Sequence, residues 1–293
     1  MSDSVNTTSA HPVRYEVTDG IATITMDRPD RGNVYNWDMA EAMIEAFDRA
    51  DADQSVRVLI VTGAGKYFCV GMDIDAFGDL GDDDRAKIGG YTRDGGGMFA
   101  LRILQMRKPV IMAMNGSAAG IGMTMTLGAD VRIAAAEGKF AFPFTRRSIA
   151  PEACSSWILP RIVGITQALE WVATGRTFRA QEGKDGRLFS YVVPAAEVMG
   201  KAREIAAEIV QNTSPLSVAA SRQMLWRALE MDSPVDAHRQ ESEAIFKLVR
   251  GPDGVEGAQA FKEKRSPQFT SSVQKDYPFD WPTWPELPDD ITN

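Results

Sequence analysis

The 293-residue sequence is poor in the side chains on which metal sites and nucleophilic enzymes depend. Its two cysteines are Cys69 and Cys154, and its two histidines are His11 and His238. None of the four has the spacing of a zinc site, so we expect no metal. The same scarcity of histidine argues against a Ser-His-Asp or Cys-His nucleophile. We expect both cysteines to be reduced thiols and both histidines to be solvated surface residues.

Long apolar runs and an excess of basic residues are missing as well. No stretch approaches the roughly 18 apolar residues of a membrane span, and the polar N-terminus lacks a signal-peptide pattern. The 40 acidic and 32 basic residues leave a formal charge of −8, which disfavours nucleic acid as a partner. A hydrophobic share of 44% is ordinary for a globular protein with a real core. We therefore expect a cytoplasmic globular protein that binds neither nucleic acid nor a membrane.

Strand and helix patterns alternate along the first part of the chain. The runs VRYEV and IATITM are joined by Asp19-Gly20, a dipeptide that predicts a β-hairpin with a type I′ turn. Asn36 is a candidate cap for a helix whose apolar residues fall on one face. The β-branched run over residues 56–62 predicts a strand that is buried on both faces.

The later pattern adds more strands and ends in helices. An acidic, glycine-rich loop with solvated charges is expected at 75–97, followed by a helix at 98–106. Further strands are expected at 110–115, 130–134, 139–143 and 188–193, and further helices at 123–129, around 166–174, and from Ala195 onward with turns at Ser214-Pro215 and Ser233-Pro234. The tail DYPFDWPTWPELPDD is too rich in proline for a regular element and is expected to drape over a surface or remain loose.

Two glycine-bearing loops follow buried strands. The spacing Gly116-x-x-x-Gly120-x-Gly122 resembles the nucleotide-binding turn of a short-chain dehydrogenase, but that turn belongs after the first strand, and none of the six tyrosines has a lysine four places later. A second loop, FCVGMDI, follows the strand at 56–62. Two adjacent strands would thus bring backbone N–H groups to one sheet edge, where they can stabilise a developing negative oxygen.

This order of motifs resembles the crotonase (enoyl-CoA hydratase/isomerase) superfamily. The resemblance covers residues 15–264 and includes the hairpin, RPDRGNVYN, FCVGMDI, NGSAAGIG, AD-x-RIAA, KFAFP, PEACSSWILPRIVG and the helical C-terminus. It implies an α/β fold, a crotonase-like spiral of β-β-α units with a helical C-terminal trimerisation region. The implied divisions are a disordered leader at 1–12, the spiral core at 13–200, the helical region at 201–266 and a Pro/Trp-rich tail at 267–293. The resemblance also implies a homotrimer or homohexamer.

The resemblance assigns roles to the two loops. Carried over position by position, the N–H groups of Met72 and Ile121 form an oxyanion hole for a coenzyme A thioester. Met72, Asp73, Ile74 and Gly120 would bind the coenzyme A portion, with the first three beside its adenine. No cofactor would be bound permanently, because coenzyme A is part of the acyl-CoA substrate.

The acid-base residue implied by the resemblance is Glu152. The two glutamates of the hydratase pattern fall at Thr124 and Phe144, so ordinary hydration is in doubt. Glu152 stands in the segment where Δ3-Δ2-enoyl-CoA isomerases carry a single glutamate, which would move a proton from C2 to C4. Trp157, Ile158 and Phe144 could supply an apolar pocket that raises its pKa.

Four alternatives remain open at this level. Glu152 could be a glutamate in the first turn of a helix after Pro151, where the helix dipole alone favours it. The protein could be a hydratase that activates water with Glu152, or a hydrolase or lyase of a CoA thioester. Outside enzymes, it could be a degenerate acyl-CoA-binding protein.

Overall fold

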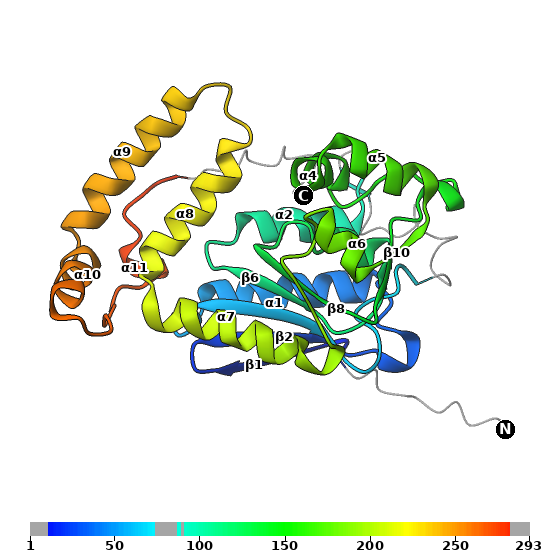
Figure 1. The fold of residues 1–293 in the computed structure, drawn as a ribbon, viewed down its shortest axis with the longest axis horizontal. Helices are drawn as coiled ribbons and strands as arrows, with labels where there is room; N and C mark the ends of the chain where they lie inside the picture. Colours follow the sequence, from blue (N-terminus) through cyan, green and yellow to red (C-terminus); the bar gives the residue numbers. More distant parts are fainter. Residues whose placement is uncertain (1–10, 74–86, 89–90, 282–293) are drawn as a thin grey trace.

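The computed structural model describes residues 11–73, 87–88 and 91–281, and a six-stranded sheet lies at its centre (Figure 1). The strands, in sheet order, are β1 (Val13–Thr18), β2 (Ile21–Met26), β3 (Val58–Gly63), β6 (Val110–Met114), β8 (Val131–Ala135) and β11 (Tyr191–Val193). β1 and β2 are antiparallel, and every other neighbouring pair is parallel. The carboxyl ends of β3 and β6 therefore lie side by side at one edge.

The predicted hairpin and the predicted helix cap are both confirmed. Asp19 (φ 51°) and Gly20 (φ 77°) adopt the left-handed conformation that a two-residue type I′ turn requires. Asn36 caps α1 (Trp37–Ala52) by accepting a 3.0 Å hydrogen bond from Met39 N on Oδ1.

Helices cover both faces of the sheet. On one face, α1 and α2 (Gly95–Gln105) bury Met43, Phe47 and Phe99 against strand residues that include Leu59 and Val61. On the other face, α7 (Val198–Asn212) packs against a cluster that includes Val58 and Ile60. Successive residues of β3 thus enter different cores, which explains why this run is apolar without alternation. The prediction of a strand buried on both faces is confirmed.

A second layer stands beyond the carboxyl ends of β3 and β6. Its elements are β7 (Ala118–Ala119), β9 (Lys139–Ala141) and β10 (Thr177–Arg179) in a three-stranded sheet, with α3 (Ile121–Thr124), α4 (Ser155–Val163), α5 (Ile165–Thr174) and α6 (Ala180–Asp185). β4 (Lys87–Ile88) pairs with β5 (Tyr91–Thr92), and single 3-10 turns occur at Pro29–Arg31, Thr145–Arg147 and Ala195–Glu197. Most of the expected acidic loop at 75–97 lies outside the described residues.

The helix expected at 123–129 is wrong in extent, because α3 ends at Thr124. The buried Arg132 guanidinium takes the carbonyl oxygens of Leu127 at 3.2 Å and Ala129 at 2.7 Å. Before them the backbone bonds span three residues, from Thr126 N to Met123 O and from Leu127 N to Thr124 O, instead of the four residues of an α-helix. The segment after α3 is therefore a series of turns.

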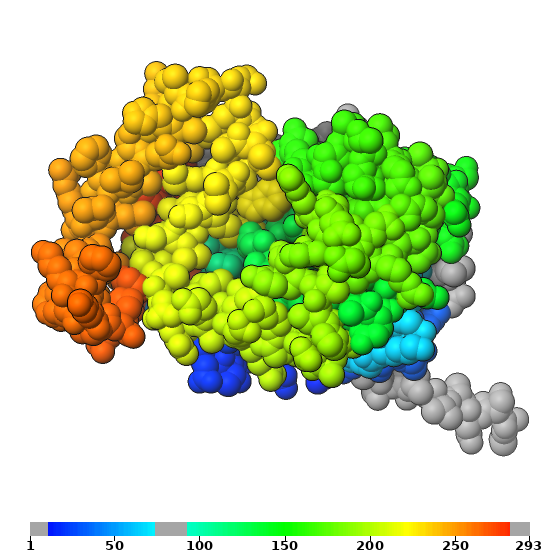
Figure 2. Space-filling model, in the orientation of Figure 1, coloured from blue at the N-terminus to red at the C-terminus, as the bar shows by residue number. Residues whose placement is uncertain are grey.

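The C-terminal helices form an arm beside the core, in yellow to red in Figures 1 and 2. Its helices are α8 (Pro215–Ala228), α9 (Pro234–Arg250), α10 (Pro252–Glu263) and α11 (Val273–Asp276). The predicted turns are N-caps: Ser214 Oγ accepts from Ser217 N and Ser233 Oγ accepts from Val235 N, with proline at the first helical position of α8 and of α9. No helix in the described part of the chain has the length and apolar character needed to cross a membrane.

One buried arginine joins the arm to the core. Arg222 of α8 donates to the carbonyl oxygens of Ile103 at 2.9 Å, Leu104 at 3.1 Å, Gly128 at 3.3 Å and Met106, and it pairs with Asp130 Oδ2 at 2.8 Å. Carbonyl oxygens at the carboxyl end of α2 and in the turn after α3 thus accept hydrogen bonds from the same guanidinium. The arm thereby anchors both segments.

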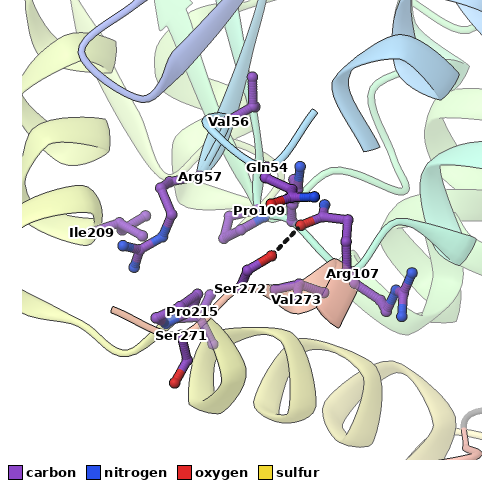
Figure 3. A pocket seen from close by; sticks show the side chains of 13 residues that line it. Gln54, Val56, Arg57, Arg107, Pro109, Ile209, Pro215, Ser271, Ser272 and Val273 are labelled. Atoms are coloured by element: carbon purple, nitrogen blue, oxygen red, sulfur yellow. Dashed lines mark hydrogen bonds between the residues drawn. The ribbon is translucent and has the colours of Figure 1, made fainter. Parts of the chain in front are cut away.

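The described part of the tail lies against the arm, which agrees with the expectation that it drapes over a surface. Phe279 is buried between α8 and α9, and Trp281 Nε1 donates to Glu243 Oε2 at 3.0 Å. Before this segment, residues 271–274 line a small pocket together with Arg57 and Pro109, which directly precede β3 and β6 (Figure 3). Residues 1–10 of the expected leader and 282–293 of the tail lie outside the described residues, and the proposed domain boundaries stay a prediction.

Candidate active site

The two glycine-bearing loops run side by side, as predicted. Cys69 and Ala118 form an isolated parallel bridge, Ala119 N donates to Cys69 O at 3.1 Å, and Phe68 N donates to Ser117 O at 3.2 Å. A Cβ on Gly122 would collide with the carbonyl oxygen of Cys69, so only glycine allows this approach. The glycine spacing in the sequence therefore serves contact between the loops.

The two N–H groups assigned to the oxyanion hole belong to Met72 and Ile121, which follow the paired residues Cys69 and Ala118 in their loops. Tyr35 N donates to Gly71 O at 2.9 Å and Asp73 N donates to Tyr35 O at 2.8 Å, so both neighbours of Met72 are held. Gly120, with φ of 53°, turns the chain into α3, of which Ile121 is the first residue. Within the described residues, neither Met72 N nor Ile121 N donates a backbone hydrogen bond. Both groups remain available to an oxygen acceptor.

Ion pairs hold the loop that carries Met72. The buried Asp73 carboxylate is 3.0 Å from an Arg31 nitrogen and 3.4 Å from an Arg28 nitrogen. Arg28 also donates to Val34 O at 3.2 Å. Of the residues predicted to bind coenzyme A, Asp73 is thus engaged within the protein, Met72 and Gly120 stand at the two loops, and Ile74 lies outside the described residues.

Glu152 precedes α4 and is not part of it. Ala153 (φ 51°) and Cys154 (φ 57°) are left-handed, and the helix begins at Ser155, which donates through N and Oγ to Glu152 O at 2.9 and 2.6 Å. Two consecutive left-handed residues cannot belong to a right-handed helix. The alternative of a first-turn helix glutamate is therefore wrong.

The Glu152 carboxyl group lies between α3 and the start of α2. Thr124 Oγ1 donates to Glu152 Oε1 at 2.5 Å. The position that a Cβ of Gly96 would occupy is 2.6 Å from Glu152 Oε2, and it would also collide with Ile121 Cδ1. The structure thus brings Glu152 and Ile121 together, with a residue without a side chain between them.

Burial raises the pKa of Glu152 to about 7, the hydrogen bond from Thr124 opposes this change, and the charge of Asp94 adds to it. Phe144 and Ile158 belong to the buried core and Trp157 packs against it, and burial is the largest cause of the shift, in the expected direction. A carboxyl group with a pKa near 7 can both accept and donate a proton at neutral pH.

Asp94 is a second carboxylate that sequence reasoning missed. Its side chain caps α2 by accepting from Gly97 N, and its Oδ1 lies 3.1 Å from the same Gly96 Cβ position. It falls within the acidic loop expected at 75–97, whose charges were all expected to be solvated. An aspartate directly before three glycines and an apolar helical run is an N-cap signal that could have separated it from that loop.

The four residues with metal-binding side chains named at the outset take no part in a metal cluster. Cys69 is buried, Cys154 is partly buried, and both are free thiols as expected. His11 and His238 are exposed, also as expected. Across the described ranges, no three His, Cys, Asp or Glu side chains converge in a way that could hold a metal ion.

The chain is similar to known proteins over most of its length. A family model described as Enoyl-CoA hydratase/isomerase matches residues 16–272. Enoyl-CoA hydratase ACTT3 of Alternaria alternata is 39% identical over 259 residues, which are 88% of this chain and 85% of the relative. The 1,2-epoxyphenylacetyl-CoA isomerase of Escherichia coli (strain K12) is 30% identical over 255 residues, 87% of this chain and 96% of that one.

A solved structure has the same fold. The crystal structure of a probable enoyl-CoA hydratase/isomerase from Mycobacterium abscessus superposes with a TM-score of 0.79 at 34% identity, covering 89% of this chain and 99% of that chain. The predicted crotonase fold is confirmed, and the helical C-terminal region is present. The family match extends over most of the sequence, and the chain belongs to the enoyl-CoA hydratase/isomerase family.

Proposed function

We propose that the protein binds an enoyl-CoA thioester and shifts its double bond, with Glu152 as the acid-base group. The observation that carries this proposal is the position of Glu152 Oε2, which shares the space at Gly96 with Ile121. A carboxyl group with a pKa of about 7 thus lies near the side chain of Ile121, the residue whose N–H is assigned to the oxyanion hole. Proton transfer next to a stabilised oxyanion is the chemistry that such a pair supports.

The proposed reaction has two proton transfers. The N–H groups of Met72 and Ile121 bind the thioester oxygen, and Glu152 takes a proton from C2 of a 3-enoyl-CoA. The electron pair of the broken C–H bond moves into the dienolate, whose negative oxygen the two N–H groups stabilise. Glu152 then returns its proton to C4, and the product is the conjugated 2-enoyl-CoA.

Isomerisation is favoured over hydration by what stands at the two hydratase positions. Thr124 and Phe144 are both fully buried and neither carries a carboxylate. Addition of water needs a group that activates the water and a group that protonates carbon, whereas a double-bond shift can use one group for both steps. Glu152 is a single carboxyl group of this kind, so it is sufficient for the double-bond shift.

The second candidate is hydration with water activated by Glu152. Asp94 favours it, because its carboxylate flanks the same Gly96 position as Glu152 and could take part in acid-base chemistry there. The Alternaria alternata relative, moreover, is named a hydratase. In this alternative the oxyanion hole keeps its role and the substrate is a 2-enoyl-CoA.

A comparison of two substrates distinguishes the candidates. We expect 3-enoyl-CoA to be converted to the conjugated isomer, which absorbs more strongly in the ultraviolet, faster than 2-enoyl-CoA gains water. Isothermal calorimetry with a non-reactive acyl-CoA gives binding independently of turnover. Hydration running far ahead of isomerisation would promote the hydratase, and an absence of any CoA-ester binding would refute both candidates.

We further propose that the chain assembles as a homotrimer or a homohexamer through its arm. The arm exposes large apolar side chains that a monomer would leave in water, namely Leu225, Leu229, Val235, Ile245, Phe246, Val249, Val255 and Phe261. Light scattering at micromolar concentration should give three or six times the 32.1 kDa chain mass. A stable monomer under these conditions would contradict the proposal.

A further inference from the structure

Thr124 occupies an unusual place for a buried hydroxyl. It is fully buried, and its Oγ1 has three acceptors within reach: Glu152 Oε1 at 2.5 Å, Gly120 O at 3.4 Å and Ile121 O at 3.5 Å. A hydroxyl has one proton to donate. The carboxylate oxygen is much the nearest of the three and carries charge, so it receives that proton in the hydrogen bond.

The two oxygens of Glu152 are therefore in different surroundings. Oε1 accepts from Thr124 within the protein, whereas Oε2 faces the space beside Gly96 and Ile121. A Cβ at Gly96 would lie only 2.6 Å from Oε2 and would collide with it, so the glycine allows the carboxylate to reach this position. Within the described residues, Oε1 accepts a hydrogen bond and Oε2 accepts none, so Oε2 is the oxygen left to exchange a proton.

The same short helix carries Thr124 and one of the two oxyanion donors. Ile121 is the first residue of α3 and Thr124 the last, and Thr124 N donates to Gly120 O at 3.0 Å. A shift of α3 would move the Ile121 N–H and the anchor of Glu152 together. The relative position of base and oxyanion donor is then held by one rigid turn.

We propose that Thr124 is a positioning residue that gives the two oxygens of Glu152 separate tasks, with Oε1 as a constant acceptor and Oε2 as the oxygen that carries the proton. This inference rests on the proposed function and deepens it. In the first step the C2–H bond breaks as an Oε2–H bond forms, and the electron pair enters the dienolate. In the second step the Oε2–H bond breaks as the C4–H bond forms, so Oε2 ends as it began.

The test compares Thr124→Val, which removes the hydroxyl at nearly constant volume, with Thr124→Ser, which keeps it. The first readout is exchange of the C2 proton of a saturated acyl-CoA with D2O, followed by NMR. The second is the dependence of kcat/KM on pH. Calorimetric binding of acyl-CoA and the melting temperature report whether each variant is folded.

The direction of the pH effect follows from which form Thr124 stabilises. Its hydrogen bond favours the ionised carboxylate, so its loss raises the pKa of Glu152. The base must be ionised to react, so the acidic limb of the Thr124→Val profile should move up by roughly one to two pH units, a shift typical of a hydrogen bond to a charged group. Exchange at neutral pH should fall about tenfold or more, since misplaced groups react slowly. Thr124→Ser should restore both.

Each outcome bears on a separate claim. If the unmodified protein exchanges no C2 proton, the proposed function fails, and this inference with it. If the unmodified protein exchanges but Thr124→Val keeps its rate and pH profile, the role of Thr124 is refuted while the proposed function stands. Should Thr124→Val fail to fold, Thr124→Ala and Thr124→Ser differ by one hydroxyl and neither crowds the core; identical profiles for these two would equally refute the role.

Discussion

Glu152→Gln is expected to lower turnover of 3-enoyl-CoA by roughly two to four orders of magnitude while binding of acyl-CoA survives. Glutamine keeps the shape of the side chain, and its carbonyl oxygen can still accept from Thr124, which lies 2.5 Å from Glu152 Oε1 in the native protein. It cannot take up a proton from carbon. Stopped-flow absorbance gives the turnover, and calorimetry gives the binding.

Glu208→Gln is the matched control, since Glu208 is an exposed residue of α7 outside the site. We expect its activity to equal that of the unmodified protein. Full activity in Glu152→Gln would show that another group moves the proton, and Asp94 would be the first to examine. A loss of binding in step with turnover would instead point to a structural role for Glu152.

Ile121→Pro is expected to lower kcat by roughly two to three orders of magnitude, because proline has no N–H to give to the thioester oxygen. Ile121 is the first residue of α3, a position at which proline is compatible with a helix. The change therefore removes the donor at a place where the backbone can accept it. Single-turnover kinetics on 3-enoyl-CoA measure the loss.

Ile121→Val keeps the N–H and changes only the side chain that lies beside Gly96. We expect it to retain most of the activity, so a large difference between the valine and proline variants isolates the donor. Equal activity of the two variants would mean that the backbone of residue 121 does not bind the oxyanion. Circular dichroism verifies that both are folded.

Local patterns were sufficient for the elements whose causes are local. The Asp19-Gly20 turn, the Asn36 cap and the strand at 56–62 each depend on a few neighbouring residues, and each is confirmed. The helix expected at 123–129 failed because the backbone bonds donated by Thr126, Leu127 and Ala129 span three residues instead of four. The side chain of Arg132, which lies outside that window, binds the carbonyl oxygens at the end of these turns. β7 and β10 are too short to leave a periodic pattern.

In the site, too, features with local causes could be predicted from the sequence and contacts between distant residues could not. The pairing of the two glycine loops followed from the order of strands, and the resemblance pointed to Glu152. The contact between Thr124 and Glu152 joins residues 28 positions apart, and it was invisible while Thr124 counted only as a missing glutamate. Asp94 was hidden by its acidic neighbours. Both contacts arise from tertiary packing, which single-sequence patterns do not report.

The arginine that joins the arm to the core also sets an order of events during synthesis. The carbonyl oxygens of Leu104 and Met106 receive hydrogen bonds from the side chains of Arg222 and Gln223, 116 to 119 positions later in the chain. Until both donors have left the ribosome, we expect these acceptors at the end of α2 to stay in water, because burying them unpaired is costly. At about 5 to 20 residues per second, that wait lasts roughly 6 to 24 seconds. We therefore expect the nascent core to stay open at the end of α2 until the arm has been synthesised and packs against it.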